Sequence, residues 1–241
     1  NAENNATIGD AVTAGQTSGT IDIDGTEGNV TTGAAGSLDA GGNITVTAGL
    51  DITIGDFVDT ENDQVTMTAG HDITINDTVT AEDDGGDATG DGIIMTADNN
   101  VSIAAAVVLR ADENGGDNGD IDIDADADSD SAGDVTMGAG SVIYGDDINI
   151  DGYNVQVMTL TADNTGAPAV MDGSGDITIH GENNVTVNNN LTAGTDATSD
   201  INIDADEGMA RQTTGNMLAG GNVYIDGGSG VDLNGTIGAG T

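Results

Sequence analysis

The amino-acid sequence predicts an all-β fold, a right-handed parallel β-helix (β-solenoid) of about nine three-sided coils of 21–29 residues. Three observations predict it. A short apolar–polar–apolar triplet recurs along the chain, further apolar positions follow it at regular distances, and Gly, Asn and Asp fill the intervals. Alternation with a period of two is typical of a half-buried strand. The right-handed sense extends to the whole helix the preference of parallel crossovers.

The first strand of each coil is the recurring triplet, and successive triplets begin 21 to 29 residues apart. Side chains alternate between the two faces of a strand, so the outer members of each triplet should face the core. The residue between them, such as Thr45 or Thr178, should face solvent. The nine predicted inward pairs are Ile21/Ile23, Ile44/Val46, Val65/Met67, Ile93/Met95, Ile121/Ile123, Ile148/Ile150, Ile177/Ile179, Ile201/Ile203 and Val223/Ile225.

The second and third strands follow within the same coil. A second alternating pair begins eight residues after the first in five coils, as in Ile52/Ile54 and in Ile73/Ile75, where Thr74 should face solvent. Turn-forming residues between the strands predict corners, and hence a triangular cross-section. A third inward position comes six or seven residues after the second pair, and we place it at Val58, Val79, Val107, Val142, Leu191 and Ile237.

The composition excludes several classes of partner. The chain has 241 residues, of which 43 are Asp or Glu and two are Arg, and its net charge is −41. Nucleic acids and anionic membrane surfaces attract basic residues, so neither is expected as a partner. No apolar run is long enough to cross a bilayer, and we expect no membrane insertion. The absence of Cys means that disulfides do not hold the fold together.

A longer repeat overlies the coils. Residues Glu3–Ile8 resemble Glu182–Val187, and Ala40–Asn43 resemble Ala219–Asn222, at an offset of 179 residues in both cases. We therefore expect residues 1–241 to be a single solenoid segment of a longer array with a repeat of about 180 residues. Unpaired strand edges template further pairing, so the segment should continue covalently or self-associate into a filament by head-to-tail stacking. Covalent continuation is the favoured alternative.

Three segments carry a resemblance to a known family. Gly42–Gly49, Ala69–Ile75 and Ala219–Ile225 resemble the shafts of filamentous-haemagglutinin-like adhesins, large bacterial surface proteins that are often exported by two-partner secretion. The resemblance implies a right-handed parallel β-helix, an extracellular or cell-surface location, and a fibrous or adhesive role. The chain departs from that family in its strong negative charge and in showing no secretion domain.

One acidic run has the composition of a calcium site. In an extended segment, Asp122, Asp124, Asp126, Asp128 and Asp130 would lie on one face, and Ca²⁺ prefers several hard oxygen ligands. The run is not an EF-hand, because it lacks the Gly and the Glu of that loop. A solvated acidic bulge remains the alternative. Looser clusters at Asp83–Asp91 and Asp112–Asp120 are more typical of solvated loops.

Asn or Asp recurs immediately before the second strand of each coil, and these side chains should stack along one corner. Side-chain hydrogen bonding along that corner is the favoured interpretation. Hydrogen bonding alone does not account for the stacking of Asp51 on Asp72. Two like charges about 5 Å apart repel by roughly 1 kcal/mol in water. A cation, a shared proton or an outward rotation must relieve that repulsion. The predicted series is Asn29, Asp51, Asp72, Asn100, Asp134, Asn154 and Asn184.

The sequence predicts a structural protein, an acidic and cation-stabilised fibre or adhesin shaft. A surface module that binds calcium or cell-surface glycans is the alternative, and a polysaccharide-acting enzyme ranks third. Enzymatic activity is not expected, because Arg110, Arg211, His71 and His180 lie in different coils. We interpret His71 and His180 as surface turn residues.

Overall fold

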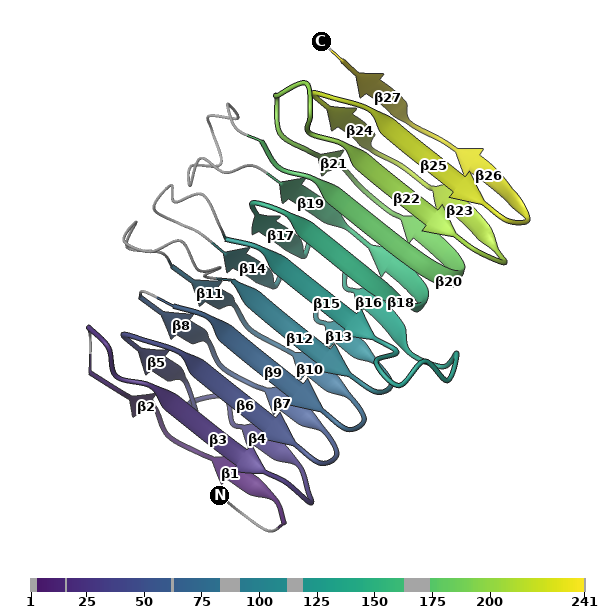
Figure 1. Cartoon of the computed structure of the whole chain (residues 1–241). Coiled ribbons are helices and arrows are strands. Elements are labelled where there is room, and N and C mark those ends of the chain that lie inside the picture. Colours follow the sequence, from purple (N-terminus) through teal and green to yellow (C-terminus); the bar gives the residue numbers. More distant parts are fainter. Residues whose placement is uncertain are drawn as a thin grey trace.

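The computed structural model describes residues 4–15, 17–61, 63–82, 92–111, 119–162 and 174–240. Within these residues every strand pairing is parallel, and each strand pairs with its equivalent in the coil above and below. The result is a stack of about nine coils with the chain termini at opposite ends (Figure 1). The predicted parallel β-solenoid is therefore confirmed. The described part of the chain contains no helix that could span a membrane.

The first side of the stack consists of the nine predicted strands. Most of them are five residues long, because a small residue, Ala or Gly, fills one more inward position after each apolar pair. Two longer strands, β18 (Ile148–Val157) and β20 (Ile177–Val187), continue past the corner that follows this small residue and also form part of the second side. The strands are β3 (Ile21–Gly25), β6 (Ile44–Ala48), β9 (Val65–Ala69), β12 (Ile93–Ala97), β15 (Ile121–Ala125), the first part of β18 (Ile148–Val157), the first part of β20 (Ile177–Val187), β22 (Ile201–Ala205) and β25 (Val223–Gly227).

The second side presents one outward residue per coil. From Thr7 to Thr136 this residue is Thr or Ser in each of six successive coils, in parallel register. The register shifts at the corner between Gly152 and Asn154. The strands are β1 (Ala6–Ile8), β4 (Val30–Thr32), β7 (Ile52–Ile54), β10 (Ile73–Ile75), β13 (Val101–Ile103), β16 (Asp134–Met137), the second parts of β18 and β20, β23 (Met209–Gln212) and β26 (Gly230–Leu233).

The third side forms a separate sheet, and here one predicted inward position, Val142, is wrong. Val107 is buried in the core as predicted, and Leu109, two residues later on the same face, pairs with Val79 and with Ile143. Ile143 is therefore the inward residue of the next coil, and Val142 lies on the outward face. Val142 and Ile143 are adjacent apolar residues, so alternation alone did not decide which of them faces the core. The strands are β2 (Val12–Thr13), β5 (Leu38–Ala40), β8 (Val58–Thr60), β11 (Val79–Ala81), β14 (Val108–Ala111), β17 (Val142–Gly145), β19 (Thr159–Ala162), β21 (Leu191–Thr192), β24 (Asn216–Ala219) and β27 (Thr236–Ala239).

The core is a continuous column enclosed by the three sides. The predicted inward residues of the first and second sides are fully buried through most of the stack, including Ile44, Ile75 and Ile177. Thr45 and Thr74 point outward but are half-buried, because each lies between the outward residues of the neighbouring coils. In the last coil, by contrast, the side chains that continue the columns are exposed: Val231 by 45%, Leu233 by 40% and Ile237 by 41%.

Candidate cation sites on the corners of the coils

A ladder of side-chain hydrogen bonds runs along the corner that precedes the second side. The Oδ1 atom of Asn29 accepts the backbone N–H of Asp51 at 3.2 Å. In the same way Asp72 accepts the N–H of Asn100 at 3.0 Å, and Asn100 accepts that of Asp134 at 3.1 Å. The predicted stacking is confirmed. Each rung needs only an acceptor oxygen, so Asn and Asp serve equally well. The other rungs are Asn5, Asp51, Asp134, Asn154 and Asn184.

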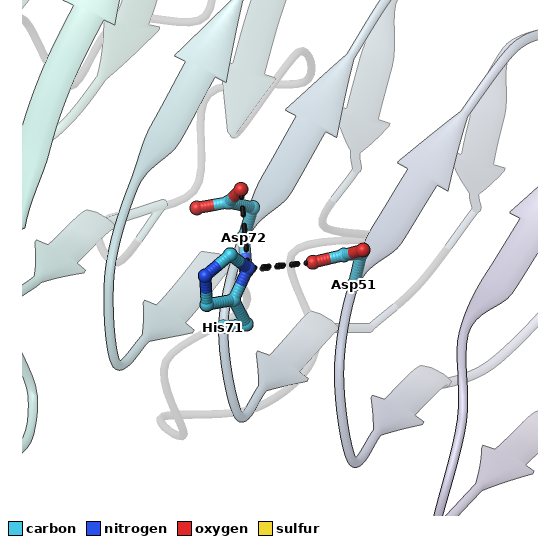
Figure 2. A group of neighbouring side chains, drawn as sticks. All are labelled: Asp51, His71 and Asp72. Carbon is cyan, nitrogen blue, oxygen red and sulfur yellow. Dashed lines mark hydrogen bonds and ion pairs between the residues drawn. The ribbon is translucent and has the colours of Figure 1, made fainter.

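His71 contacts both Asp51 and Asp72, the two stacked aspartates whose like charges are expected to repel each other. Its Nδ1 atom is 2.8 Å from Oδ1 of Asp51 and 3.2 Å from Oδ2 of Asp72 (Figure 2). The hydrogen bond to Asp51 and then the charge of Asp72 raise the pKa of His71 above its usual value. His71 does lie in the turn before β10, as expected, but the interpretation as a turn residue missed this contact. In its protonated form, which the raised pKa favours, the imidazole relieves the repulsion between Asp51 and Asp72.

His180 bridges coils in a different manner. It lies inside β20 and not in a turn, which corrects the interpretation from sequence. Its Nδ1 atom is 3.1 Å from both carboxylate oxygens of Asp151, and its Nε2 atom is 3.5 Å from Oδ2 of Asp206. Partial burial lowers the pKa of His180, but the hydrogen bonds and charges of Asp151 and Asp206 outweigh it and the net direction is upward.

A second ladder, which the sequence analysis missed, precedes the first side. The Oδ1 atom of Asp120 accepts the N–H of Asp147 at 3.1 Å, Asp147 accepts that of Asp176 at 2.7 Å, and Asp176 accepts that of Asp200 at 2.7 Å. Burial, followed by the charge of Asp147, raises the pKa of Asp120 against the effect of its backbone hydrogen bond. The signal was present in the sequence, because an Asp directly precedes the Ile-x-Ile triplet in these four coils.

The five residues of the predicted calcium run separate into two groups. Asp122 and Asp124 lie on β15, where Asp122 accepts a hydrogen bond from Nδ2 of Asn149 at 3.0 Å. The strand ends at Ala125, so the alternation that would have aligned all five carboxylates stops there. A turn instead brings one carboxylate oxygen from each remaining aspartate to within 4.8 Å of the others. This second group is Asp126, Asp128 and Asp130.

The loop after β15 is organised around the buried carboxylate of Asp126. Its Oδ1 atom accepts the N–H of Asp130 at 3.0 Å, and its Oδ2 atom accepts that of Ser131 at 3.2 Å. Asp128 and Asp130 are exposed, and the negative charge of Asp128 raises the pKa of Asp130. Such a loop offers hard oxygen donors to a cation, and it is equally suited to a solvated acidic turn.

The two looser acidic clusters of the sequence lie wholly or mostly outside the described residues. Asp83–Asp91 lie outside the described residues, and so do Asp112–Asp117. Asp120, at the end of the second cluster, belongs to the aspartate ladder described above.

Comparisons of the chain with protein-family models, with curated proteins and with solved structures return no match.

Proposed function

We propose that this chain is a shaft segment of an extracellular or cell-surface fibre, with a structural role. The observation that carries the proposal is the unbroken coil-on-coil pairing of the first side from β3 to β25. Stacked repeats make a quasi-one-dimensional object whose length grows with the number of coils. At about 4.8 Å per coil, nine coils give a rod segment of roughly 43 Å. The likeness of three segments to adhesin shafts supports the same role.

The outward surface suits an isolated rod in water. Its residues are mostly Thr, Asn and Asp, and the chain carries a net charge of −41. Like charge on neighbouring rods opposes lateral bundling and keeps a fibre soluble. The same charge opposes compact stacking of the coils, which is why the proposed fibre is stabilised by cations.

The longer repeat in the sequence favours a stack of more coils than these, because Glu3–Ile8 resemble Glu182–Val187 and Ala40–Asn43 resemble Ala219–Asn222. We propose that the further coils belong to the same polypeptide, with head-to-tail stacking of separate subunits as the alternative. A concentration-dependent mass in sedimentation would support separate subunits, whereas the gene sequence around this segment tests covalent continuation.

The location can be tested on cells that produce the protein. Antibodies raised against the folded segment should label intact, unpermeabilised cells, and electron microscopy should place the label along thin filaments. A cytoplasmic protein of the same cells provides the control, because it should be labelled only after permeabilisation. Labelling of the segment that also requires permeabilisation would rule out a surface fibre.

A calcium-binding surface module is the second candidate, favoured by the approach of Asp126, Asp128 and Asp130. Calorimetric titration should then show one Ca²⁺ site that is lost in the double variant Asp128→Asn/Asp130→Asn. Asp22→Asn, a change at an exposed residue of β3, is the control and should keep the site. Weak binding that is equal in all three proteins would mean that these carboxylates are a solvated turn. A module of this kind could present bound calcium to cell-surface glycans.

A further inference from the structure

We propose that His71, Asp51 and Asp72 form a binding site for a divalent transition metal of the Zn²⁺ class, which links two consecutive coils. The site is separate from the predicted calcium run and does not depend on the fibre role. Asp51 comes from the turn between β6 and β7, and His71 and Asp72 come from the equivalent turn one coil later (Figure 2).

The imidazole nitrogen already lies at coordination-sphere distances from one oxygen of each carboxylate. The Nδ1 atom of His71 is 2.8 Å from Oδ1 of Asp51 and 3.2 Å from Oδ2 of Asp72. Around a metal with bonds of about 2.0–2.2 Å, neighbouring ligand atoms lie roughly 2.9–3.5 Å apart. The ligand atoms of all three residues lie within 4.8 Å of one another, so small side-chain movements suffice to gather them around one ion. The side chains are 53%, 38% and 33% exposed for His71, Asp51 and Asp72, so an ion can reach them from solvent.

The chemistry of the imidazole requires an electrophile at this point. A neutral ring with its proton on Nε2 would direct the Nδ1 lone pair at two carboxylates, which is repulsive. The Nδ1 atom must therefore carry a proton or a metal ion. A nitrogen ligand also decides which metal fits, because imidazole suits Zn²⁺, Ni²⁺ and Cu²⁺, whereas Ca²⁺ and Mg²⁺ prefer sites made of oxygen alone.

The carboxylate of Asp72 is held in position by groups that are not candidate ligands. Its Oδ1 atom accepts hydrogen bonds from the N–H of Asn100 at 3.0 Å, from Nδ2 of Asn100 at 3.0 Å and from Nδ2 of Asn99 at 2.8 Å. These bonds leave Oδ2 directed at His71. Partners of this kind orient metal ligands and lower the cost of assembling a site.

His180 provides an internal comparison. Each of its ring nitrogens faces a different carboxylate, Asp151 at Nδ1 and Asp206 at Nε2. That arrangement is satisfied by an imidazolium with two protons, and an ion at one nitrogen would satisfy only one of the two carboxylates. The difference predicts that Zn²⁺ selects His71.

Because the chain contains two histidines, proton NMR can follow both rings during a Zn²⁺ titration of the whole chain. A large excess of Mg²⁺ should be present to occupy the other carboxylates. The expected result is that the His71 resonances shift and saturate at one molar equivalent, while those of His180 do not. His180→Gln should keep the one-equivalent site, and His71→Gln should abolish it.

Two further variants separate loss of ligands from loss of fold. Asp51→Asn and Asp72→Asn keep an acceptor oxygen for the ladder, since Asn occupies this rung in other coils, but each removes one charged ligand. Each should weaken Zn²⁺ binding by about tenfold or more. Unchanged Zn²⁺ binding in His71→Gln, or parallel shifts of both histidines without saturation, would overturn the proposal.

Discussion

At the scale of single residues, each basic side chain of this acidic chain contacts a neighbouring coil. His71 reaches Asp51, and His180 reaches Asp151 on one side and Asp206 on the other. The Nε atom of Arg211 lies 3.7 Å from Oδ2 of Asp232 in the next coil. Arg110 lies 5.1 Å from the ring centre of Tyr144, its register partner, at a distance suited to a cation–π contact. Positive charge in this protein is thus placed where it links coils.

The bridge made by His180 should be sensitive to pH. The folded state raises its pKa, so the stabilisation is complete below the unfolded value near 6.5 and is lost as pH rises through the folded value. His180→Gln should therefore lower stability by about 0.5 kcal/mol near pH 6 and have almost no effect near pH 9. Thermal unfolding of both proteins at the two pH values measures this difference. An equal loss at both values would mean that packing, and not charge, explains the effect.

Some of these residue-level features could be predicted from the sequence. The repulsion between Asp51 and Asp72 followed from counting positions, and so did the ladder along the corner. The contact of His71 with the two aspartates could not be predicted in this way. The direction of a side chain in a turn depends on backbone angles that alternation does not specify. The calcium run shows the same limit. The rule that alternate residues share a face holds for Asp122 and Asp124 on β15, and it fails beyond Ala125, where the strand ends.

At the scale of the strand, burial follows alternation closely. The first-side triplets were predictable in all nine coils, because β-branched residues and Met mark their inward positions. The added small residue, such as Ala48 or Ala69, was not recognised, since Ala and Gly occur throughout the chain. The third side was misplaced by one residue in one coil, where Ile143 and not Val142 faces the core, because the two apolar residues are adjacent.

Substitutions in β10 should separate the two faces of a strand. Ile75 is fully buried and pairs with Ile54 and Ile103 in the neighbouring coils. Ile75→Ala should cost about 2–5 kcal/mol through lost burial and the cavity left behind. Thr74→Ala, one residue earlier on the outward face, is the matched control and should change stability by less than about 0.5 kcal/mol. Urea unfolding midpoints compare the two variants, and similar losses would contradict the assigned faces.

At the scale of the whole molecule, the excess of negative charge is the property expected to set how stability depends on pH and salt. Two histidines and three aspartates among the described residues have a pKa that differs clearly from the ordinary value, and in all five the pKa is raised. The folded state therefore holds these protons more tightly than the unfolded chain does. Burial is the main cause at Asp120 and Asp124, the charge of Asp128 is the main cause at Asp130, and contacts with aspartates raise the pKa of both histidines. A net charge of −41 acts in the same direction, because its self-repulsion is strongest in the compact state. The five residues are His71, His180, Asp120, Asp124 and Asp130.

Mild acid should consequently stabilise the protein. A raised pKa in the folded state means that stability is gained as pH falls through that value and is lost as pH rises through it. We expect the melting temperature at constant ionic strength to increase from about pH 8 to about pH 5, in contrast to proteins whose carboxylates are held by salt bridges. Added NaCl should also raise it at pH 8, by screening the repulsion. A melting temperature that falls in acid would show that self-repulsion between carboxylates does not control the stability of the rod.

The direction of the coil-to-coil hydrogen bonds sets how such a rod responds to tension. Bonds such as that from the N–H of Ile52 to the carbonyl of Asp72, at 2.8 Å, lie along the stack, whereas the strands lie across it. Pulling on the two chain ends therefore opens these bonds a row at a time and peels off single coils. A coil that occupies about 4.8 Å of the rod extends to roughly 70–100 Å when released. Single-molecule force–extension curves should show steps of that size, so the rod would yield gradually and absorb mechanical load without breaking.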